Sequence, residues 1–293
     1  MILIDLNQVV ISNLMVSING KHNDVEKGLV QHMILNSILS IKKRFGNEYG
    51  NVVLCCDNKN FWRKDFFPQY KGQRKKIREN SGHDWSMIFN TISKTKSDLR
   101  KYFPYKIIEV DRTEADDIIG TLVKNFSKYE KTIIISSDKD FKQLQKYPNV
   151  KQYSPILKKF LITEAPNEYI REHIIRGDSG DGVPNFLSDD DVFVTENKRQ
   201  KPLSRKKLTE WLDLSRDPED FCDSNMLEKY KRNERLVDLS FIPEEIQDKI
   251  LQEFSQEPVG DMTKVFNYFI ENKMVLMMDE LTNFKERKYE TYP

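Results

Sequence analysis

Four short apolar runs, each ending at an acid, constrain the fold of this chain more than any other feature. Their aliphatic and β-branched residues show no polar alternation, which is typical of strands covered on both faces. Segments with helical spacing separate the runs. The order therefore predicts an α/β fold with a mainly parallel central sheet and flanking helices. The runs lie at 1–6, 52–57, 106–111 and 132–138.

The acids at the ends of these runs predict a shared site. The carboxyl ends of parallel strands meet at one edge of a sheet, where open α/β sheets bind their ligands. A helix that begins after the third run adds acids in its first turn, and we expect Thr113 to be its N-cap. The acids placed at this edge are Asp5, Asp57, Glu114, Asp116, Asp117, Asp138 and Asp140.

A smaller, mainly helical unit is predicted after the sheet. Prolines at 148, 155 and 166 punctuate the chain, so we divide it into an α/β domain at 1–160 and a helical domain at 161–293. A helix ending at Gly177 opens the second domain. Asp178 and Asp181 follow it and join the predicted site, whereas the acids at 189–191 are interpreted as a solvated loop.

Nine converging carboxylates need a counter-charge, because unit charges ~4 Å apart at a dielectric near 20 interact by about 4 kcal/mol. The four histidines are scattered at 22, 32, 83 and 173, and we expect none of them in the site. Oxygen ligands alone favour a hard divalent cation, Mg²⁺ with Mn²⁺ as a substitute, over zinc or copper. So many acids suggest two ions, which in pairs ~4 Å apart clamp a phosphodiester during in-line displacement.

The segment 59–79 mixes basic and aromatic residues. It holds eight Lys/Arg against Asp65 and Glu79, with five aromatic side chains among them. Cations that follow phosphates and rings that stack on bases suit a nucleic-acid strand. The alternative is a solvated basic face whose aromatic rings pack inward. A second basic block at 198–207 contains no acid.

Composition excludes several other classes. The net charge is only +1, so the basic segments are a local feature. Three cysteines, two of them adjacent in an apolar run, fit a reducing compartment better than a disulfide framework. No apolar run approaches the ~20 residues of a membrane helix, and Asp5 interrupts the N-terminus before a signal peptide could form. We therefore expect a cytoplasmic protein with no membrane partner.

The chain resembles the flap endonuclease / 5′-nuclease family in six motifs, found here in the same order. They are the strand-Asp at Asp5, the strand-Asp at Asp57, FWRKDFFPQYKGQR, TEADD, SSDKD and GDSGDG. The phrase ISSDKDFKQLQKYPNVKQYSP and the length are similar to the T-even bacteriophage ribonuclease H branch of that family. The resemblance implies a 5′-nuclease/PIN-like fold with a basic arch at about 59–103 and a helix-two-turn-helix-like element in the helical domain.

The resemblance also implies an activity. It implies a metal-dependent 5′→3′ nuclease, with ribonuclease H, exonuclease and flap endonuclease activities, that removes RNA primers and adjacent DNA from lagging-strand fragments. Its substrates would be RNA–DNA hybrids and forked or flapped duplex DNA. Its other partners would be the single-stranded-DNA-binding protein and sliding clamp of replication. We expect a monomer, in the host cytoplasm if a phage encodes it.

The site roles follow from the same motifs. The metals would be held by Asp5, Asp57, Glu114, Asp116, Asp138 and Asp140, with Asp117, Asp178 and Asp181 completing the second site. Lys71 and Arg74 match the family's YKxxR and would act in catalysis at the scissile phosphate with Asp116 and Asp138. The implied nucleic-acid contacts are Arg63, Lys64, Tyr70, Lys71, Arg74, Lys75, Lys76, Arg78, Lys198, Arg199, Lys201, Arg205, Lys206 and Lys207.

The chain departs from the family pattern in one segment. Gly182 stands where the family commonly has Asn, and Phe186–Leu187 replace glycines. Two other functions remain open from the residues: a non-catalytic protein that binds branched DNA, and a PIN-type endoribonuclease. The complete set of acids argues against the first, and the long basic–aromatic segment argues against the second.

Overall fold

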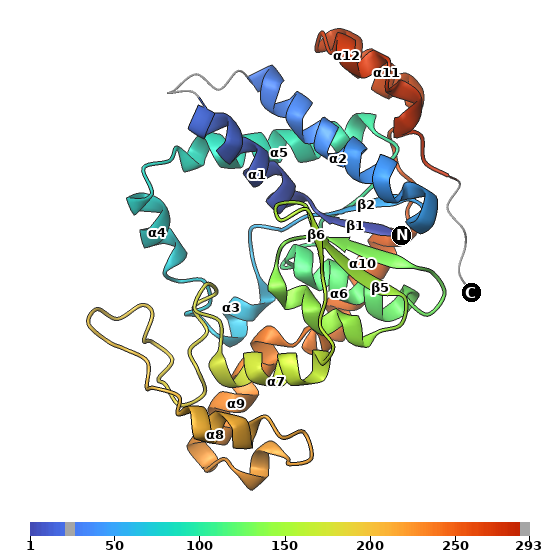
Figure 1. Ribbon diagram of the computed structural model, residues 1–293. Coiled ribbons are helices and arrows are strands. Elements are labelled where there is room, and N and C mark those ends of the chain that lie inside the picture. Colours follow the sequence, from blue (N-terminus) through green and yellow to red (C-terminus); the bar gives the residue numbers. More distant parts are fainter. Residues whose placement is uncertain (21–26, 288–293) are drawn as a thin grey trace.

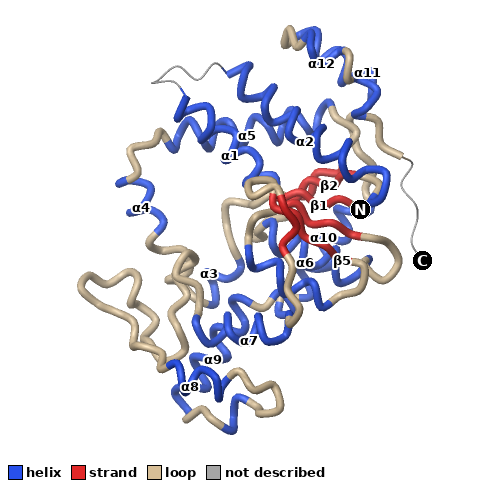
Figure 2. The backbone as a smooth tube through the Cα atoms, in the orientation of Figure 1, coloured by secondary structure: helices blue, strands red, loops and turns tan. Residues whose placement is uncertain are grey.

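The computed structural model describes residues 1–20 and 27–287 of the chain. Its described part contains one six-stranded sheet in the order β3-β2-β1-β4-β5-β6. Figure 2 shows the strands, in red, gathered among the helices. All neighbouring pairs are parallel except β5 with β6, which confirms the mainly parallel sheet. The strands are β1 (Ile2–Asp5), β2 (Val52–Cys55), β3 (Lys106–Ile108), β4 (Thr132–Ile135), β5 (Val150–Ser154) and β6 (Lys159–Leu161).

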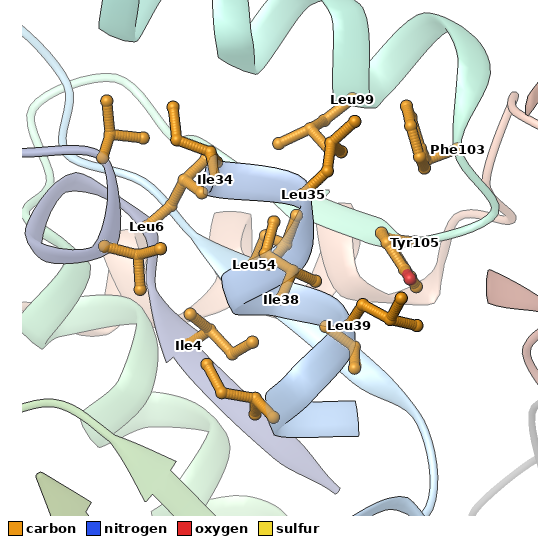
Figure 3. Close-up of a cluster of buried hydrophobic side chains, with 14 of the residues drawn as sticks. Ile4, Leu6, Ile34, Leu35, Ile38, Leu39, Leu54, Leu99, Phe103 and Tyr105 are labelled. Atoms are coloured by element: carbon orange, nitrogen blue, oxygen red, sulfur yellow. The ribbon is translucent and has the colours of Figure 1, made fainter. Parts of the chain in front are cut away.

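Helices cover both faces of the sheet (Figure 1), because alternate residues of the apolar strands point to opposite sides. Ile4 and Leu54 face one helical layer, in which Ile34, Ile38 and Leu99 pack over them (Figure 3). This layer is α1 (Leu6–Gly20), α2 (Lys27–Tyr49), α5 (Trp85–Tyr102), α11 (Met262–Glu271) and α12 (Val275–Met278). The other face meets α6 (Ala115–Phe126) and α10 (Glu244–Ser255).

The remaining helices, apart from α4, form a lobe beyond the carboxyl edge of the sheet. Its core is a separate apolar cluster that includes Phe67 and Tyr70 from the basic–aromatic segment. In Figure 1, α4 lies on the stretch that joins α3, beside this lobe, to α5 in the upper layer. The helices are α3 (Trp62–Phe66), α4 (Arg74–Asn80), α7 (Pro166–Arg176), α8 (Arg205–Trp211) and α9 (Ser224–Val237). The 3₁₀ helices are η1 (Lys139–Lys146), η2 (Pro218–Asp220), η3 (Leu239–Phe241) and η4 (Leu281–Phe284).

The C-terminal region is helical, as expected, but its last helices return to the sheet. Ile246 and Ile250 of α10 pack against the α6 face, and Val265 and Phe269 of α11 pack in the opposite layer. The division at residue 160 therefore stays a prediction, because part of the predicted second domain shares the core of the first. None of the described helices is long and apolar enough to cross a membrane.

One helix was not predicted, and one local expectation was wrong. Helix α1 follows strand β1 directly, since Leu6 comes after Asp5 without any break between strand and helix. Helix α6 is capped by Glu114, whose partner in a capping box is Asp117, and Thr113 instead donates its hydroxyl to Val110 O. The expected helix at 25–45 is α2, which reaches Tyr49; its positions 25 and 26 and His22 lie outside the described residues. Asp84 caps α5 as expected.

Candidate active site

The predicted acids meet at the carboxyl edge of the sheet, between β1, β2, β4 and α6. Asp5 ends β1, and its Oδ1 accepts from Gln8 N at 3.1 Å. Asp57 follows β2 and links two elements, because its Oδ1 accepts from Ala115 N at 2.7 Å at the start of α6. Asp138 follows β4 and caps η1 by accepting from Asp140 N. The strand ends therefore place these side chains together without any contribution from the helical lobe.

Burial and mutual repulsion make part of this cluster unfavourable when it is fully charged. Burial, and then the charge of Asp57, raise the pKa of Asp5 to about 7. Burial raises the pKa of Asp116 well above its ordinary value, with repulsion from Asp138 and Glu114 adding to the effect. Burial likewise raises the pKa of Asp138. A cation bound beside these acids would offset their repulsion and favour their charged form.

Glu114 and Asp117 are instead neutralised from inside the protein. Arg63 Nη1 lies 3.1 Å from Glu114 Oε2 and 2.8 Å from Asp117 Oδ1, and its Nε donates to Leu236 O at 2.8 Å. Trp62 Nε1 donates to Asp117 Oδ1, while Asp117 Oδ2 accepts from Glu114 N. Asp117 is fully buried, and both of its oxygens are occupied. These contacts assign it to capping and charge balance, which argues against the predicted ligand role.

Arg63 and Tyr70 do not lie at the surface, contrary to their prediction as nucleic-acid contacts. Arg63 is 2% exposed and Tyr70 is 3% exposed. The Tyr70 hydroxyl hydrogen-bonds Glu114 Oε2 at 2.8 Å and Asp181 Oδ2 at 2.7 Å. Trp62 and Phe67 are buried as well. The alternative interpretation of this segment, in which its aromatic rings pack inward, is therefore correct for Trp62, Phe67 and Tyr70. Trp62 packs in the core beside α6, and Phe67 and Tyr70 pack in the core of the helical lobe.

Lys71 and Arg74 reach the edge of the acidic cluster. Lys71 Nζ pairs with Glu114 Oε1 and lies 3.4 Å from Asp181 Oδ2, and Arg74 Nη2 pairs with Asp181 Oδ1. Burial alone would lower the pKa of Lys71, but Glu114 and Asp181 raise it above its ordinary value. Lys71 also has a left-handed backbone (φ 56°), and its N–H donates to Asp181 O at 2.7 Å. Asp181 is thus paired with cations, which corrects the expectation that all nine acids repel one another.

The loop after α7 carries Asp178 next to these residues. Gly177 opens it at φ 66°, where a Cβ would lie 2.3 Å from Val183 O, so only glycine fits without a backbone shift. Asp178 Oδ1 accepts from Gly180 N at 2.7 Å and from Asp181 N at 3.1 Å. Its hydrogen bond with His173 holds the pKa of Asp178 below its ordinary range.

His173 belongs to the site, and the expectation that no histidine does was wrong. Its Nε2 lies 3.2 Å from Asp178 Oδ2, and its Nδ1 lies 3.5 Å from Asp140 Oδ1. Burial, and then the charge of Asp138, raise the pKa of Asp140 to about 7, although His173 opposes the rise. One donor atom from each of these three residues lies within 4.8 Å of the other two, a group that could hold a metal ion. The missed signal was the placement of His173 in the last turn of a helix, five residues before Asp178.

Most of the other predicted nucleic-acid contacts are exposed. Besides Arg74, two already have acidic neighbours: Lys198 lies 3.2 Å from Asp189 and 2.5 Å from Asp191, and Lys76 lies 3.2 Å from Glu196. The acids at 189–191 are therefore at the surface and outside the site, as expected. The exposed basic residues are Lys64, Arg74, Lys75, Lys76, Lys198, Arg199, Lys201, Arg205, Lys206 and Lys207, with Arg78 half-buried.

Comparison with known proteins identifies the family to which this fold belongs. Residues 1–174 match the model of the 5′-3′ exonuclease N-terminal resolvase-like domain, and residues 165–284 match that of the T4 RNase H C-terminal region. The chain is 33% identical to ribonuclease H of Enterobacteria phage T4 over 290 residues, covering 96% of this chain and 95% of that protein. A flap endonuclease Xni of Shewanella piezotolerans is 34% identical over 132 residues, 42% of this chain and 48% of that protein.

Solved structures share the fold. The D15 protein of bacteriophage T5, co-crystallised with metal ions, matches with a TM-score of 0.62 at 15% identity, over 86% of this chain and 97% of that one. The T5 D15 flap endonuclease complex with DNA and metal ions matches with a TM-score of 0.60 at 16% identity, over 87% of this chain and 99% of that one. These findings favour the nuclease over the two alternatives. The chain belongs to the 5′-3′ exonuclease family and is a 5′-3′ nuclease.

Proposed function

We propose that this nuclease removes RNA primers and adjacent DNA from lagging-strand fragments, acting on RNA–DNA hybrids and on forked or flapped duplexes with the help of two Mg²⁺ ions. The observation that carries the proposal is the meeting of the strand-end acids with Lys71 and Arg74 at one edge of the sheet. A site for phosphodiester hydrolysis needs both ligands for cations and groups that bind the phosphate. The names of the relatives, a ribonuclease H and a flap endonuclease, support the choice of substrates.

The acids fit divalent cations. Carboxylates whose pKa is raised by burial and repulsion lack a counter-charge, which a hard cation with oxygen ligands supplies. Bound there, the ions would supply activated water at neutral pH and neutralise charge on the phosphate. Glu114 and Asp181 lie at the margin of this group because protein cations already pair with them. The residues we propose as ligands are Asp5, Asp57, Asp116, Asp138 and Asp140, with Asp178 beside them as the hydrogen-bond partner of His173.

Lys71 and Arg74 would bind the reacting phosphate. Both now pair with acids, so a phosphate that enters the site exchanges one anionic partner for another and leaves no cation uncompensated. Negative charge on the phosphate grows in the transition state, where preorganised cations act most strongly. The left-handed backbone of Lys71, held by Asp181 O, fixes the start of this side chain. Tyr70 and Arg63 hold Glu114 in place, Tyr70 through a hydrogen bond and Arg63 through an ion pair.

Duplex contact is proposed for the second basic block. Lys201, Arg205, Lys206 and Lys207 are exposed around the start of α8, and no acid lies within the block. Neutralising phosphates there would give affinity without reading the base sequence. We further propose that the enzyme is a phage-encoded monomer of the host cytoplasm and that it contacts the single-stranded-DNA-binding protein and the sliding clamp.

A cleavage assay tests the proposal. RNA-primed, nicked and 5′-flapped duplexes with labelled ends are incubated with Mg²⁺ or with EDTA, and product lengths are measured. We expect short 5′ products from all three substrates in Mg²⁺ and none in EDTA. The proposed substrate range fails if RNA-primed duplex remains intact while flapped DNA is cut. The proposed metal fails if cleavage persists in EDTA.

A further inference from the structure

His173 lies inside the acidic cluster with one ring nitrogen unused. The residue is 7% exposed, and its Nε2 is engaged with Asp178 Oδ2 at 3.2 Å. Its Nδ1 faces Asp140 Oδ1 at 3.5 Å, and neither atom has a hydrogen-bond partner in the described part of the chain. A buried polar atom without a partner costs about 1–3 kcal/mol. Two such atoms that face one another indicate a shared missing partner.

The surroundings of the ring match those of a metal-bound imidazole. A histidine that ligates a metal through one nitrogen usually donates its other N–H to a carboxylate, which fixes the tautomer and the ring orientation. Asp178 is placed to accept that proton, and its other oxygen is fixed by Gly180 N at 2.7 Å and Asp181 N at 3.1 Å. In the tautomer that donates from Nε2, the lone pair of His173 Nδ1 points toward Asp140.

The separation of the two unused atoms indicates the kind of ion. Two bonds of about 2.1 Å to atoms 3.5 Å apart subtend about 113° at the ion, which is close to a tetrahedral angle. Neighbouring ligands in an octahedral magnesium site, at bonds of about 2.1 Å, lie only about 3.0 Å apart. An imidazole nitrogen is also a ligand typical of transition metals, whereas Mg²⁺ prefers oxygen.

We propose that His173 Nδ1 and Asp140 Oδ1 bind a divalent transition-metal ion of the Co²⁺ or Zn²⁺ class, and that Asp178 orients the imidazole. The inference rests on the proposed function and refines it: one cation position of the site has a nitrogen ligand and discriminates against Mg²⁺. The competing explanation is that the ring only links two carboxylates and touches no ion.

Pulsed EPR of the whole protein loaded with high-spin Co²⁺, without substrate, separates these explanations. A directly bound imidazole gives a nitrogen hyperfine coupling to Co²⁺, which changes when the histidines are labelled with ¹⁵N. We expect this coupling in the wild type and in His83→Asn, which alters a histidine outside the site, and its loss in His173→Asn. Absence of the coupling in the wild type overturns the proposal, and this result does not depend on whether the variant folds.

Calorimetric titrations with Co²⁺ and Mg²⁺ give a second measurement. We expect His173→Asn to weaken Co²⁺ binding by at least about tenfold while Mg²⁺ affinity changes much less, and we expect His83→Asn to match the wild type. Equal Co²⁺ affinity in all three proteins overturns the proposal. Mg²⁺-dependent cleavage of forked DNA by the wild type, together with no nitrogen coupling, would refute this inference and leave the proposed function standing.

Discussion

Gln73 fills the space that a side chain at position 182 would occupy. A Cβ added to Gly182 would lie 2.5 Å from Gln73 Oε1, while Gln73 Nε2 donates to Ser179 O at 2.8 Å. Arg74 Nε also donates to a carbonyl of the same loop, Gly180 O, at 3.3 Å. The start of the basic arch is therefore fastened to the loop that carries Asp178 and Asp181, and the glycine that departs from the family pattern makes room for the contact.

The first prediction tests this fit. Gly182→Ala should destabilise the protein by more than Gly82→Ala and should lower the cleavage rate, whereas Gly82→Ala should not. Both glycines have φ near 70° and share a left-handed penalty of about 1–2 kcal/mol, but no atom of the described residues lies within 4 Å of a Cβ at Gly82. The difference in melting temperature between the two variants measures the cost of the close contact at position 182, because the left-handed penalty is common to both. Adding Gln73→Ala to Gly182→Ala should recover part of the loss, and equal costs at the two glycines would contradict the fit.

The second prediction concerns the chemistry. Asp138→Asn should abolish cleavage and leave the affinity for forked DNA similar or slightly higher, because a repelling charge is removed from the phosphate site. The amide can still accept from Asp140 N, so the start of η1 should persist. Binding is measured by fluorescence anisotropy and turnover by product length. Substantial residual turnover in Mg²⁺ would remove Asp138 from the proposed ligands.

The third prediction separates two sets of cations. Lys71→Ala and Arg74→Ala should lower kcat more than they weaken binding, because these side chains would meet charge that develops in the transition state. Neutralising Lys201, Arg205 and Lys206 together should instead weaken duplex binding and flatten its salt dependence. Steady-state kinetics and binding at several salt concentrations measure both effects. The same kinetic signature from both sets would refute the assignment.

The fourth prediction compares two acids of the cluster by melting in EDTA. Asp116→Asn should melt higher than the wild type, because it removes a charge that repels Asp138 and Glu114. Asp181→Asn should melt lower, because Asp181 loses its pairing with Lys71 and Arg74. Saturating Mg²⁺ should reduce or reverse the gain at Asp116, since binding to the folded state adds about 2.7 kcal/mol at a hundredfold excess over Kd. A lower melt for Asp116→Asn in EDTA would place that acid outside the repelling group.

The fifth prediction is the pH dependence of the metal-free protein. The pKa of Asp5 is about 7 in the folded state against an ordinary value of 3.8, so the folded state holds its proton more tightly than the unfolded chain does. This contribution to stability is present below about pH 4 and is lost as the pH rises toward 7, by at most about 1.4 kcal/mol per pH unit. The melting temperature of the wild type minus that of Asp5→Asn should therefore fall between pH 5 and pH 7. A flat difference in EDTA would mean that Asp5 is charged throughout.

The sequence by itself determined four of the six strands and the edge at which the acids gather, but not β5 and the antiparallel β6. Short β-branched runs without alternation are typical of covered strands, and parallel strands bring Asp5, Asp57 and Asp138 to one edge. The order of the motifs then indicated the family. These conclusions depend on the local pattern of apolar residues and on the direction of the strands. Both can be inferred from short, continuous segments of the sequence.

Only the tertiary structure decided which charged groups neutralise one another. Arg63 lies 51 residues from Glu114 in sequence, and Lys71 lies 110 residues from Asp181, yet both pairs form inside the fold. Counting acids along the chain could not separate the paired Asp117 and Asp181 from the unpaired Asp116, because burial and long-range contacts set the difference. For the same reason, the sequence by itself indicates no role for His173 in the site. A histidine on an amphipathic helix has no visible partner until the helix docks beside η1 and turns its ring between Asp140 and Asp178.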